Sequence, residues 1–593
     1  MCGIAGVYHF NQEYSIRHDS LVKMLEKIKH RGPDSSGIEY VNSSCAFMHS
    51  RLAIIDVTES SHQPYVTKSG SILNYNGEIY NFKELQKLVS LPLERNSDTS
   101  TLAMGLCEHG IDFTKNIDGM FAFSFWSTEN NALYIARDYF GIKPLYYYKD
   151  NDKFIFASEI KAILEYPEVN KTLDQDAINE FFQLGYILDP DTGFKHIKQL
   201  KAGHCLKITN EAINEYTLPE SKLHSDDLFL NNLKLSIKRR LTSDVPITTL
   251  YSGGIDSSLI AQEIPSHISL SHLDLISTNY SESQKAILHA SYLDKTIDII
   301  QSSSDINLKN IVYYADDLIA DPALVSNFLL YQEISKKYKV GIQGDGADEL
   351  FWGYFTHTAV RLANFKAIRF FIPCLNFILL CLNKLPTQNR YSLSMKITRF
   401  LKAFKQGFPY VYLLWRSPFL GNIVKTSYNK KYTLNKLNKL LPSKFQNPLD
   451  IDFYTYMISN ILKKVDRMSM AFGYEVRVPF LSTYVVHSAN KIKPSKRSTF
   501  FKRKKYLLTL FQHKKILKQK KSGFGFDLVK LMKNEDYRDF LLSSDSHVFN
   551  HFIDHEKLML LLEKKCYDYD TSYQIFTLLV FKYWLQNYNI SEL

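Results

Sequence analysis

The chain has 593 residues, of which 45% are hydrophobic and 22% are charged, and its formal net charge is +11. That length is too great for one hydrophobic core, and it predicts about two to four domains. The composition is ordinary for a soluble protein and gives no sign of disorder. The positive charge is compatible with an anionic ligand or surface, but it identifies neither.

The cysteines and the first residues both indicate a reducing, cytoplasmic setting. The cysteines are odd in number and never spaced as CxxC, which argues against a disulfide framework and a structural zinc site. The N-terminus lacks the charged and apolar regions of a signal peptide. The cysteines are Cys2, Cys45, Cys107, Cys205, Cys374, Cys381 and Cys566.

The first third of the chain has the pattern of a mostly β domain. Residues 1–210 contain short β-type runs separated by Gly, Asn and Asp, among them CGIAGVYHF, SILNYNG and GMFAFSFWS. Helices are expected at HDSLVKMLEKIKH (18–30) and DTSTLAMGLCEHG (98–110). Residues 211–227 are polar and contain Pro219, so they predict a linker before a second domain over 228–593.

The second domain has the pattern of an α/β fold. The runs VPITTLYSGG, LDLISTNY (273–280) and KVGIQGDG each read as an apolar strand that leads into a loop. This alternation with helices predicts a parallel sheet whose ligands lie at the carboxyl ends of its strands. From about residue 353 the chain reads as mostly helical. The apolar run at 370–382 is shorter than the roughly 20 residues that span a bilayer, so we expect a buried helix there, with interfacial membrane contact as the alternative.

Cys2 is the first candidate for chemistry. Once Met1 is removed, this residue carries both a thiol and the chain's free α-amine, whose pKa of about 7.7 to 8.0 suits it to take the thiol proton. Cys2 is then a nucleophile beside its own base. The alternative is a small apolar residue at the start of a buried strand.

The stretch SGGIDSS (252–258) follows an apolar strand and opens a helix. Its glycines allow a tight turn in which several amide N–H groups point at one anion, so the stretch predicts a phosphate cradle. It lacks the GK[ST] of a P-loop. An acid inside the cradle is explained only if a divalent metal separates it from the phosphate, and a serine-rich turn is the alternative. The cradle residues are Ser252, Gly253, Gly254, Asp256, Ser257 and Ser258.

A second acidic loop, GDGADELFWGY (344–354), also follows an apolar strand. Asp345, Asp348 and Glu349 would repel one another unless a cation offsets their charges. Solvated loop acids are the alternative.

These motifs resemble those of one family. SGGIDSS with GDGADE resembles the pyrophosphatase-type ATP site of the asparagine synthetase family, and MCGIAGV resembles that family's N-terminal glutaminase. HRGPDSSG, SRLAIID, YNGEIYN and SDTS are similar to the glutaminase half, and KVDRMSMA, EVRVPFL and KQKKSGFGF to the synthetase half. The resemblance implies an α/β two-domain chain, with an α/β/β/α sandwich glutaminase at 1–210 and a parallel-sheet ATP-pyrophosphatase-type domain with a helical C-terminal part at 228–593.

For the glutaminase half, the resemblance implies that the thiolate attacks the side-chain amide of glutamine. Ammonia leaves, and water hydrolyses the resulting γ-glutamyl thioester. An oxyanion needs preorganised donors, and the α-carboxylate and α-amine of glutamine need opposite charges. The implied roles are nucleophile for Cys2, oxyanion donors for Asn76 and Gly77, carboxylate partner for Arg51, and ammonium partners for Glu78 and Asp98.

For the synthetase half, the resemblance implies that the aspartate carboxylate attacks MgATP to give β-aspartyl-AMP and pyrophosphate, and that ammonia then displaces AMP. Asp256 and Asp348 would hold Mg²⁺, Asp345 would act in acyl-adenylate chemistry, and Lys521 would neutralise phosphate charge. The implied ATP-binding residues are Leu250, Ser252, Gly253, Gly254, Asp256, Ser257, Ser258, Thr278, Gln343 and Gly344.

Several alternatives stay open at this point. The acceptor could be another carboxylate, such as a uronic acid of a surface polysaccharide, and rival classes are a regulatory protein with degenerate sites and a lactam-forming cyclase. The expected partners are glutamine, aspartate and ATP, without nucleic acid or membrane, and a homodimer is left open. The basic stretch KPSKRSTFFKRKK (493–505) is compatible with nucleic-acid binding, but no recognised RNA or DNA module accompanies it, so it is interpreted as the solvated face of a helix near an ATP site.

The sequence departs from the family pattern at three places. Ser100 and Ser482 stand where the family often has acids, and WGY (352–354) stands where it usually has GGY. The last two lie in the half that binds the acceptor, so they bear on which acceptor is used.

Overall fold

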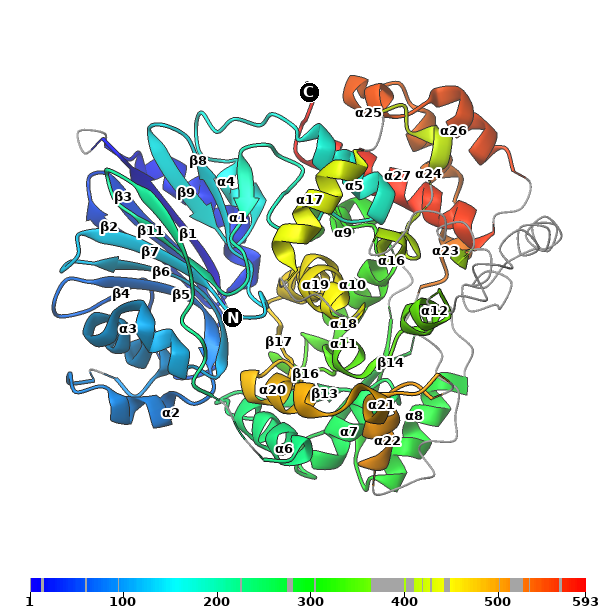
Figure 1. The fold of residues 1–593 in the computed structure, drawn as a ribbon. Coiled ribbons are helices and arrows are strands. Elements are labelled where there is room, and N and C mark those ends of the chain that lie inside the picture. Colours follow the sequence, from blue (N-terminus) through cyan, green and yellow to red (C-terminus); the bar gives the residue numbers. More distant parts are fainter. Residues whose placement is uncertain are drawn as a thin grey trace.

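The computed structural model describes residues 2–592 except 12–14, 59–60, 94, 224, 226, 275–280, 303–305, 364–398, 401–409, 419, 427–428, 442–447, 501, 512–525, 533 and 565–567. Within the described residues, the N-terminal domain contains two six-stranded antiparallel sheets (Figure 1). Their strand orders are β10-β8-β9-β1-β3-β2 and β12-β11-β7-β6-β5-β4. The strands are β1 Gly3–His9, β2 Ser35–Asn42, β3 Cys45–Arg51, β4 Tyr65–Val66, β5 Ile72–Ile79, β6 Gly119–Ser127, β7 Ala132–Arg137, β8 Tyr146–Lys149, β9 Lys153–Ala157, β10 Ile197–Gln199, β11 His204–Ile208 and β12 Ile213–Thr217.

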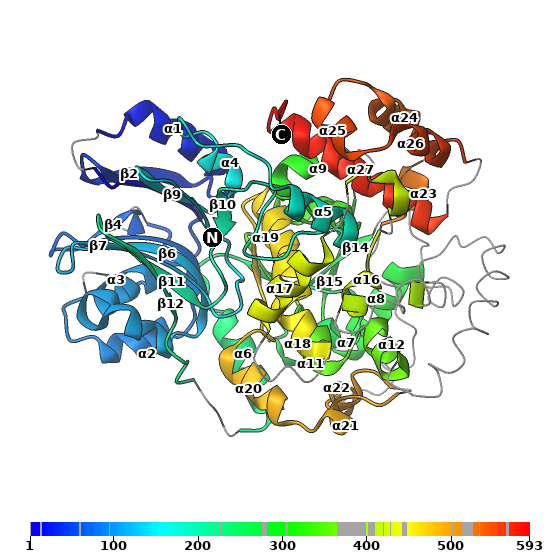
Figure 2. The same ribbon diagram turned by 45° about the horizontal axis from the view of Figure 1, so that its top comes forward.

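Helices cover the outer faces of the two sheets (Figure 2). On the first sheet, α1 packs against β1 and β3, and α4 against β8 and β9; on the second, α3 packs against β5 and α2 against α3. Apolar side chains of both sheets, among them Phe47 and Phe156 of the first and Ile72 and Trp126 of the second, fill the space between them. The predicted α/β/β/α sandwich is confirmed. These helices are α1 His18–Ile28, α2 Phe82–Leu85, α3 Asp98–His109 and α4 Ile160–Ile163.

Local sequence signals explain the two long helices of this domain. In α1, Leu21, Met24, Leu25 and Ile28 are buried at helical spacing, so one face of the helix meets the sheet. In α3, the Ser97 hydroxyl caps the N-terminus. The second sheet continues through β12, which pairs with β11, so it takes in residues 213–217 of the segment that the sequence interprets as a linker.

The second domain is built on a five-stranded parallel sheet of order β15-β14-β13-β16-β17, as far as the described residues show. The chain moves outward from β13 to β14 and β15 and then returns to β16 on the other side of β13. This switch point brings the loops after β13 and β16 together, which is where such sheets bind ligands. The strands are β13 Ile247–Leu250, β14 Leu270–Asp274, β15 Ile297–Gln301, β16 Val340–Ile342 and β17 Glu475–Arg477.

Helices make up most of the rest of this domain, as predicted. β14 covers the first two residues of the run LDLISTNY, and residues 275–280 lie outside the described part. The apolar run at 370–382 also lies outside it. The helices of this domain are α6 Phe229–Arg240, α7 Ile255–Glu263, α8 Ser281–Tyr292, α9 Leu308–Ala315, α10 Ala323–Ile334, α11 Ala347–Phe351, α12 Phe355–Ala363, α16 Tyr410–Leu414, α17 Lys430–Leu440, α18 Pro448–Ile451, a π-helical segment Asp452–Leu462, α19 Lys463–Met470, α20 Thr483–Lys491, α21 Pro494–Arg497, α22 Lys505–Thr509, α23 Leu528–Leu531, α24 Glu535–Leu542, α25 His547–Phe552, α26 His555–Leu562 and α27 Tyr569–Asn587. One further helix, α5 Gln175–Leu184, lies before β10 in the N-terminal part of the chain.

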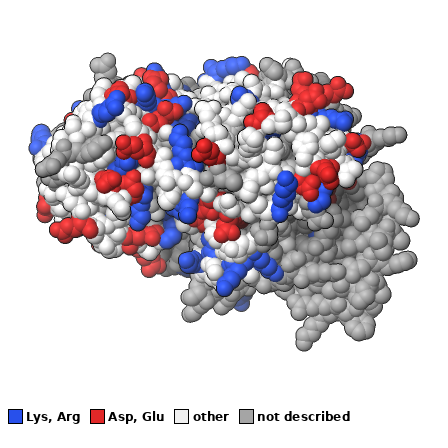
Figure 3. Space-filling view, turned by 90° about the horizontal axis from the view of Figure 1, so that it is seen from above, with Lys and Arg blue, Asp and Glu red and all other residues white. Residues whose placement is uncertain are grey.

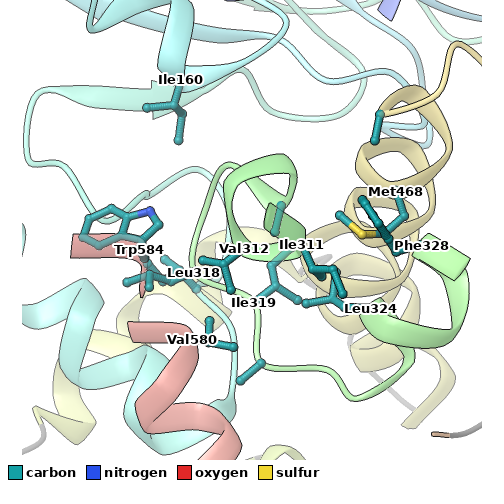
Figure 4. Close-up of a cluster of buried hydrophobic side chains, with 14 of the residues drawn as sticks. Ile160, Ile311, Val312, Leu318, Ile319, Leu324, Phe328, Met468, Val580 and Trp584 are labelled. Carbon is teal, nitrogen blue, oxygen red and sulfur yellow. The ribbon is translucent and has the colours of Figure 1, made fainter. Parts of the chain in front are cut away.

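One hydrophobic core joins the two domains. Ile160 of α4 belongs to the same buried cluster as Val312 of α9, Met468 of α19 and Trp584 of α27 (Figure 4). On the face shown in Figure 3, basic and acidic side chains are interspersed over the described residues. Among the helices of the described part, none has the length and apolar character needed to cross a membrane.

Candidate active sites

A pocket opens at Cys2, where the chain enters β1, and it is lined further by the end of β3 and the loop after it, by β5 and by the first residues of α3. It brings together most of the residues predicted for glutamine, and others that were not predicted. Its lining is Cys2, Arg51, Leu52, Ile54, Ile55, Ser61, Gln63, Tyr75, Gly77, Glu78, Ser97, Asp98 and Thr99.

Cys2 and Asn76 are held together beside this pocket. The Cys2 backbone nitrogen donates a hydrogen bond of 3.0 Å to Asn76 Oδ1. Asn76 Nδ2 is buried and has no hydrogen-bond partner among the described residues. A buried donor without a partner costs stability, so its presence next to a candidate nucleophile indicates a ligand oxygen. Burial raises the pKa of the Cys2 thiol, whereas the Leu52 N–H and the Arg51 charge lower it.

Two buried carboxyl groups, Glu78 and Asp98, line the same pocket. The Tyr75 hydroxyl and the backbone N–H groups of Ile79 and Thr99 donate to Asp98. Burial raises the pKa of both carboxyl groups, and the charge of Asp98 raises that of Glu78 further. A ligand ammonium would favour the ionised form of both.

Arg51 supplies a positive charge to the same pocket, and its side chain is held in place by hydrogen bonds. Its guanidinium donates to the backbone carbonyls of Thr58, at 2.9 Å, and Asp56. The side chain is buried and lines the pocket. A guanidinium held in this way can receive a carboxylate with its remaining N–H groups.

The two predicted ATP loops meet at the switch point of the parallel sheet. A Cβ added to Gly344 would lie 2.9 Å from the Cβ of Asp256, so only glycine allows this approach. Ser252 Oγ lies 3.2 Å from Ser257 Oγ, and both hydroxyls lie at the turn before α7. The Ser258 hydroxyl is different, because it is fully buried and bonds to Tyr251. Ser258 therefore supports the loop from behind.

Lys504 lies between the carboxylates of the two loops, and the sequence did not single it out. Its Nζ lies 2.6 Å from Asp256 Oδ2 and 2.5 Å from Asp348 Oδ1, and the side chain is buried. Burial alone would lower the pKa of Lys504, but the two carboxylates raise it above its usual value. The interpretation of residues 493–505 as one solvated helix face is wrong here. The described residues of the segment include α21 and the start of α22, which are separate helices, and Arg497 is buried as well as Lys504.

The position of Lys504 shows that Asp256 and Asp348 converge on one cation. Two carboxylates plus substrate phosphates are a usual ligand set for Mg²⁺, so these residues fit the metal. Within the described residues, no group of three or more His, Cys, Asp or Glu converges as a metal site. A Cβ on Gly353 would lie 1.5 Å from Asp348 Oδ1, so the glycine of WGY makes room for this carboxylate.

The remaining predicted residues are placed as follows. Leu250 ends β13, and Gln343, Gly344 and Asp345 follow β16. The Tyr331 hydroxyl donates to Gln343 Oε1 at 2.9 Å. Burial and the charge of Asp348 raise the pKa of Glu349 to about 8, and the Tyr354 hydroxyl donates to it, so this acid is not a solvated loop side chain. Thr278 and Lys521 lie outside the described residues.

Comparison with known proteins decides the family. A family model described as Asparagine synthase matches residues 229–586, and one described as Glutamine amidotransferase domain matches residues 1–218. The chain belongs to the asparagine synthetase family. It is 29% identical to asparagine synthetase (glutamine-hydrolysing) 1 of Bacillus subtilis over 98% of this chain and 96% of that protein.

Two further asparagine synthetases are similarly close. Asparagine synthetase (glutamine-hydrolysing) 3 of Bacillus subtilis is 31% identical over 81% of this chain and 79% of that protein. Putative asparagine synthetase (glutamine-hydrolysing) 2 of Methanocaldococcus jannaschii is 30% identical over 81% of this chain and all of that protein. The resemblance drawn from the motifs is confirmed.

The structure explains why two asparagine synthetase motifs, HRGPD and KVDRM, accompany each other. Arg31 of the first is fully buried and binds Asp466 of the second at 3.0 Å and Glu159 at 2.8 Å. Its Nε also donates to the Cys2 carbonyl at 3.1 Å. One side chain therefore ties the residue predicted as nucleophile to α19 of the second domain.

Ser482, one departure from the asparagine synthetase pattern, lies at the domain interface. Its hydroxyl donates to Asp118 Oδ1 at 3.1 Å, and Tyr484 donates to Asp118 Oδ2. An acid at position 482 would place a second carboxylate against Asp118. This departure is therefore explained by interdomain packing.

Proposed function

We propose that the protein is a glutamine-hydrolysing ligase that converts aspartate to asparagine. The N-terminal pocket would release ammonia, and the loops of the parallel sheet would activate the acceptor carboxylate with ATP. The observation that carries the proposal is the buried Asn76 Nδ2, which has no partner in the described part of the chain and lies beside Cys2. Membership of the asparagine synthetase family supports it.

The glutaminase step would begin at Cys2. Because burial raises the pKa of the thiol, the sulfur needs a base at neutral pH, and the α-amine of the processed residue can take its proton. The thiolate attacks the amide carbon of glutamine. Asn76 Nδ2 and the Gly77 N–H stabilise the oxyanion, and ammonia leaves. Water then hydrolyses the thioester and releases glutamate.

Recognition of glutamine would use the charges around the pocket. Arg51 would bind the α-carboxylate, and Glu78 and Asp98 would bind the α-ammonium. The ammonium would restore the negative charge that burial disfavours on both acids. This arrangement selects an α-amino acid over a plain amide.

The synthetase step would use the two loops at the switch point. The acceptor carboxylate attacks the α-phosphorus of ATP, giving β-aspartyl-AMP and pyrophosphate, and ammonia then displaces AMP. Ser252, Ser257 and the amides of the cradle would hold phosphate oxygens. Asp256 and Asp348 would hold Mg²⁺, which when bound offsets the phosphate charge. Asp345 would accept the ammonium proton, and Lys521 keeps its proposed role in neutralising phosphate charge.

The identity of the acceptor carboxylate can be tested by measuring which products form. We expect glutamine-dependent AMP formation with aspartate, together with asparagine identified by mass spectrometry, and no AMP above background with uronic acids. Asp256→Asn, which removes a metal ligand, should abolish AMP formation and leave glutaminase activity. AMP formation with a uronic acid at a rate equal to or above that with aspartate would refute aspartate as the acceptor.

A further inference from the structure

Arg477 belongs to the second domain but reaches the glutamine pocket of the first. It ends β17, next to β16, and its backbone carbonyl accepts the Gln343 N–H at 2.9 Å. Its side chain is fully buried, and Nη2 lies 3.3 Å from Glu78 Oε2. Glu78 in turn lines the pocket that holds Cys2.

The Arg477 guanidinium is held rigidly. Nε donates to Glu475 Oε1 at 2.5 Å, and Nη1 donates to the backbone carbonyls of Arg240 and Thr242 at 2.7 and 2.6 Å. These contacts fix the plane of the guanidinium and leave Nη2 facing Glu78. A planar, fixed cation is suited to orient a carboxylate.

Glu78 needs such a partner if it is to bind an ammonium group. Burial and the charge of Asp98 raise its pKa, and Arg477 acts in the opposite direction. Its other oxygen, Oε1, is buried without a hydrogen-bond partner among the described residues. One oxygen therefore faces Arg477, and the other is left for a ligand.

We propose that Arg477 is a positioning residue of the glutaminase reaction, supplied by the ATP-binding domain, which holds the Glu78 carboxylate in place for the α-ammonium group of glutamine. This inference rests on the proposed function. It assigns to a synthetase-half motif, EVRVPFL, a part in substrate recognition by the other half.

The test compares two amide donors in the full-length protein. Glutamine carries the α-ammonium, and glutaramate is the same molecule without it. Arg477→Met is expected to lower kcat/KM for glutamine about 10- to 100-fold, mostly through KM, and to change kcat/KM for glutaramate less than about threefold. Arg477→Lys, which keeps the charge but not the fixed plane, is expected to fall between wild type and Arg477→Met.

Arg239→Met is the matched control. Arg239 also makes an interdomain ion pair, with Glu84 at 2.7 Å and Asp118 at 3.1 Å, but it does not line the glutamine pocket. The control should leave the ratio of the two kcat/KM values unchanged. If Arg477→Met does not fold, Arg477→Lys serves as the test. A ratio of kcat/KM for glutamine to kcat/KM for glutaramate that is at least about threefold lower than in wild type supports the inference.

One result would overturn the inference, namely a ratio of kcat/KM for glutamine to kcat/KM for glutaramate that stays at the wild-type value in the Arg477 variants. If both donors lost activity equally, Arg477 would have a structural role, and if neither lost activity, it would have no part in the reaction. Wild-type protein that releases no glutamate from glutamine would instead refute the proposed function, and the inference with it.

Discussion

Replacing Arg31 with methionine tests whether the glutaminase site depends on the buried contact between the domains. Methionine fills similar volume but removes the charge and the hydrogen bond to the Cys2 carbonyl. Arg31, Glu159 and Asp466 are almost fully buried, so the ion pairs are not screened by water. Removing one partner of such a pair costs about 3 to 5 kcal/mol.

The structure places the expected cost at the lower end of this range. Glu159 keeps Lys161 at 2.5 Å, and Asp466 keeps Lys143 at 3.6 Å, so neither carboxylate is left without a cation. We expect Arg31→Met to lower the free energy of unfolding by about 3 kcal/mol. Glutaminase activity of the folded protein should also fall, because the carbonyl of Cys2 loses its anchor.

Urea denaturation followed by circular dichroism measures the first quantity, and glutamate release below the transition measures the second. Lys29→Met is the control, because Lys29 pairs with Glu26 on the surface and such pairs contribute about 0 to 1 kcal/mol. In the double variant Arg31→Met/Asp466→Asn, the loss should be smaller than the sum of the single losses. A loss in Arg31→Met no greater than in the control would refute the reasoning.

The other predictions concern the metal site, the ATP loop and pH. Lys504→Met removes the cation between Asp256 and Asp348, so Mn²⁺ should bind the nucleotide-free protein at least about tenfold more tightly in an electron paramagnetic resonance titration. Gly353→Ala would push a methyl into Asp348, so AMP formation should fall at least about tenfold while glutaminase activity stays within about twofold. The raised pKa of Glu78 means that this acid takes up a proton more readily than usual, whereas ammonium binding requires it ionised. The KM for glutamine should therefore rise as pH falls, beginning above the ordinary carboxyl range.

Each of these predictions has an outcome that contradicts it. Lys502 is exposed and lies two residues before Lys504, so Lys502→Met should leave the affinity for Mn²⁺ unchanged. Equal Mn²⁺ affinity in Lys502→Met and Lys504→Met would mean that Lys504 does not occupy the cation position between Asp256 and Asp348. An undiminished rate of AMP formation in Gly353→Ala would mean that the reaction does not depend on the present position of the Asp348 carboxylate. A KM that stays constant down to about pH 5 would show that Glu78 ionises like an ordinary carboxyl group.

The motifs predicted the parts of the site that are close together in sequence. MCGIAGV, YNGEIYN and SDTS marked Cys2, Asn76 and Asp98, and the structure brings Cys2 and Asp98 to one pocket with Glu78. The glycine-rich loops could be read because a strand, a tight turn and a helix are local features. The parallel sheet followed from the same alternation.

Residues that act across long sequence separations could not be predicted in this way. Arg31 and Asp466 are 435 positions apart, and nothing in either motif says which carboxylate the arginine meets. Lys504 stands among other basic residues, and only the fold shows that it is buried between two acids. Arg477 was part of a recognised motif, but its contact with Glu78 depends on how the domains pack.

The central claim is that Cys2 releases ammonia from glutamine in one domain for use by an ATP-dependent reaction in the other. The most direct measurement is asparagine formation by Cys2→Ala with glutamine and, separately, with ammonium chloride as the nitrogen donor. We predict that glutamine-dependent synthesis is abolished and ammonia-dependent synthesis is retained. Continued asparagine formation from glutamine in this variant would contradict the account.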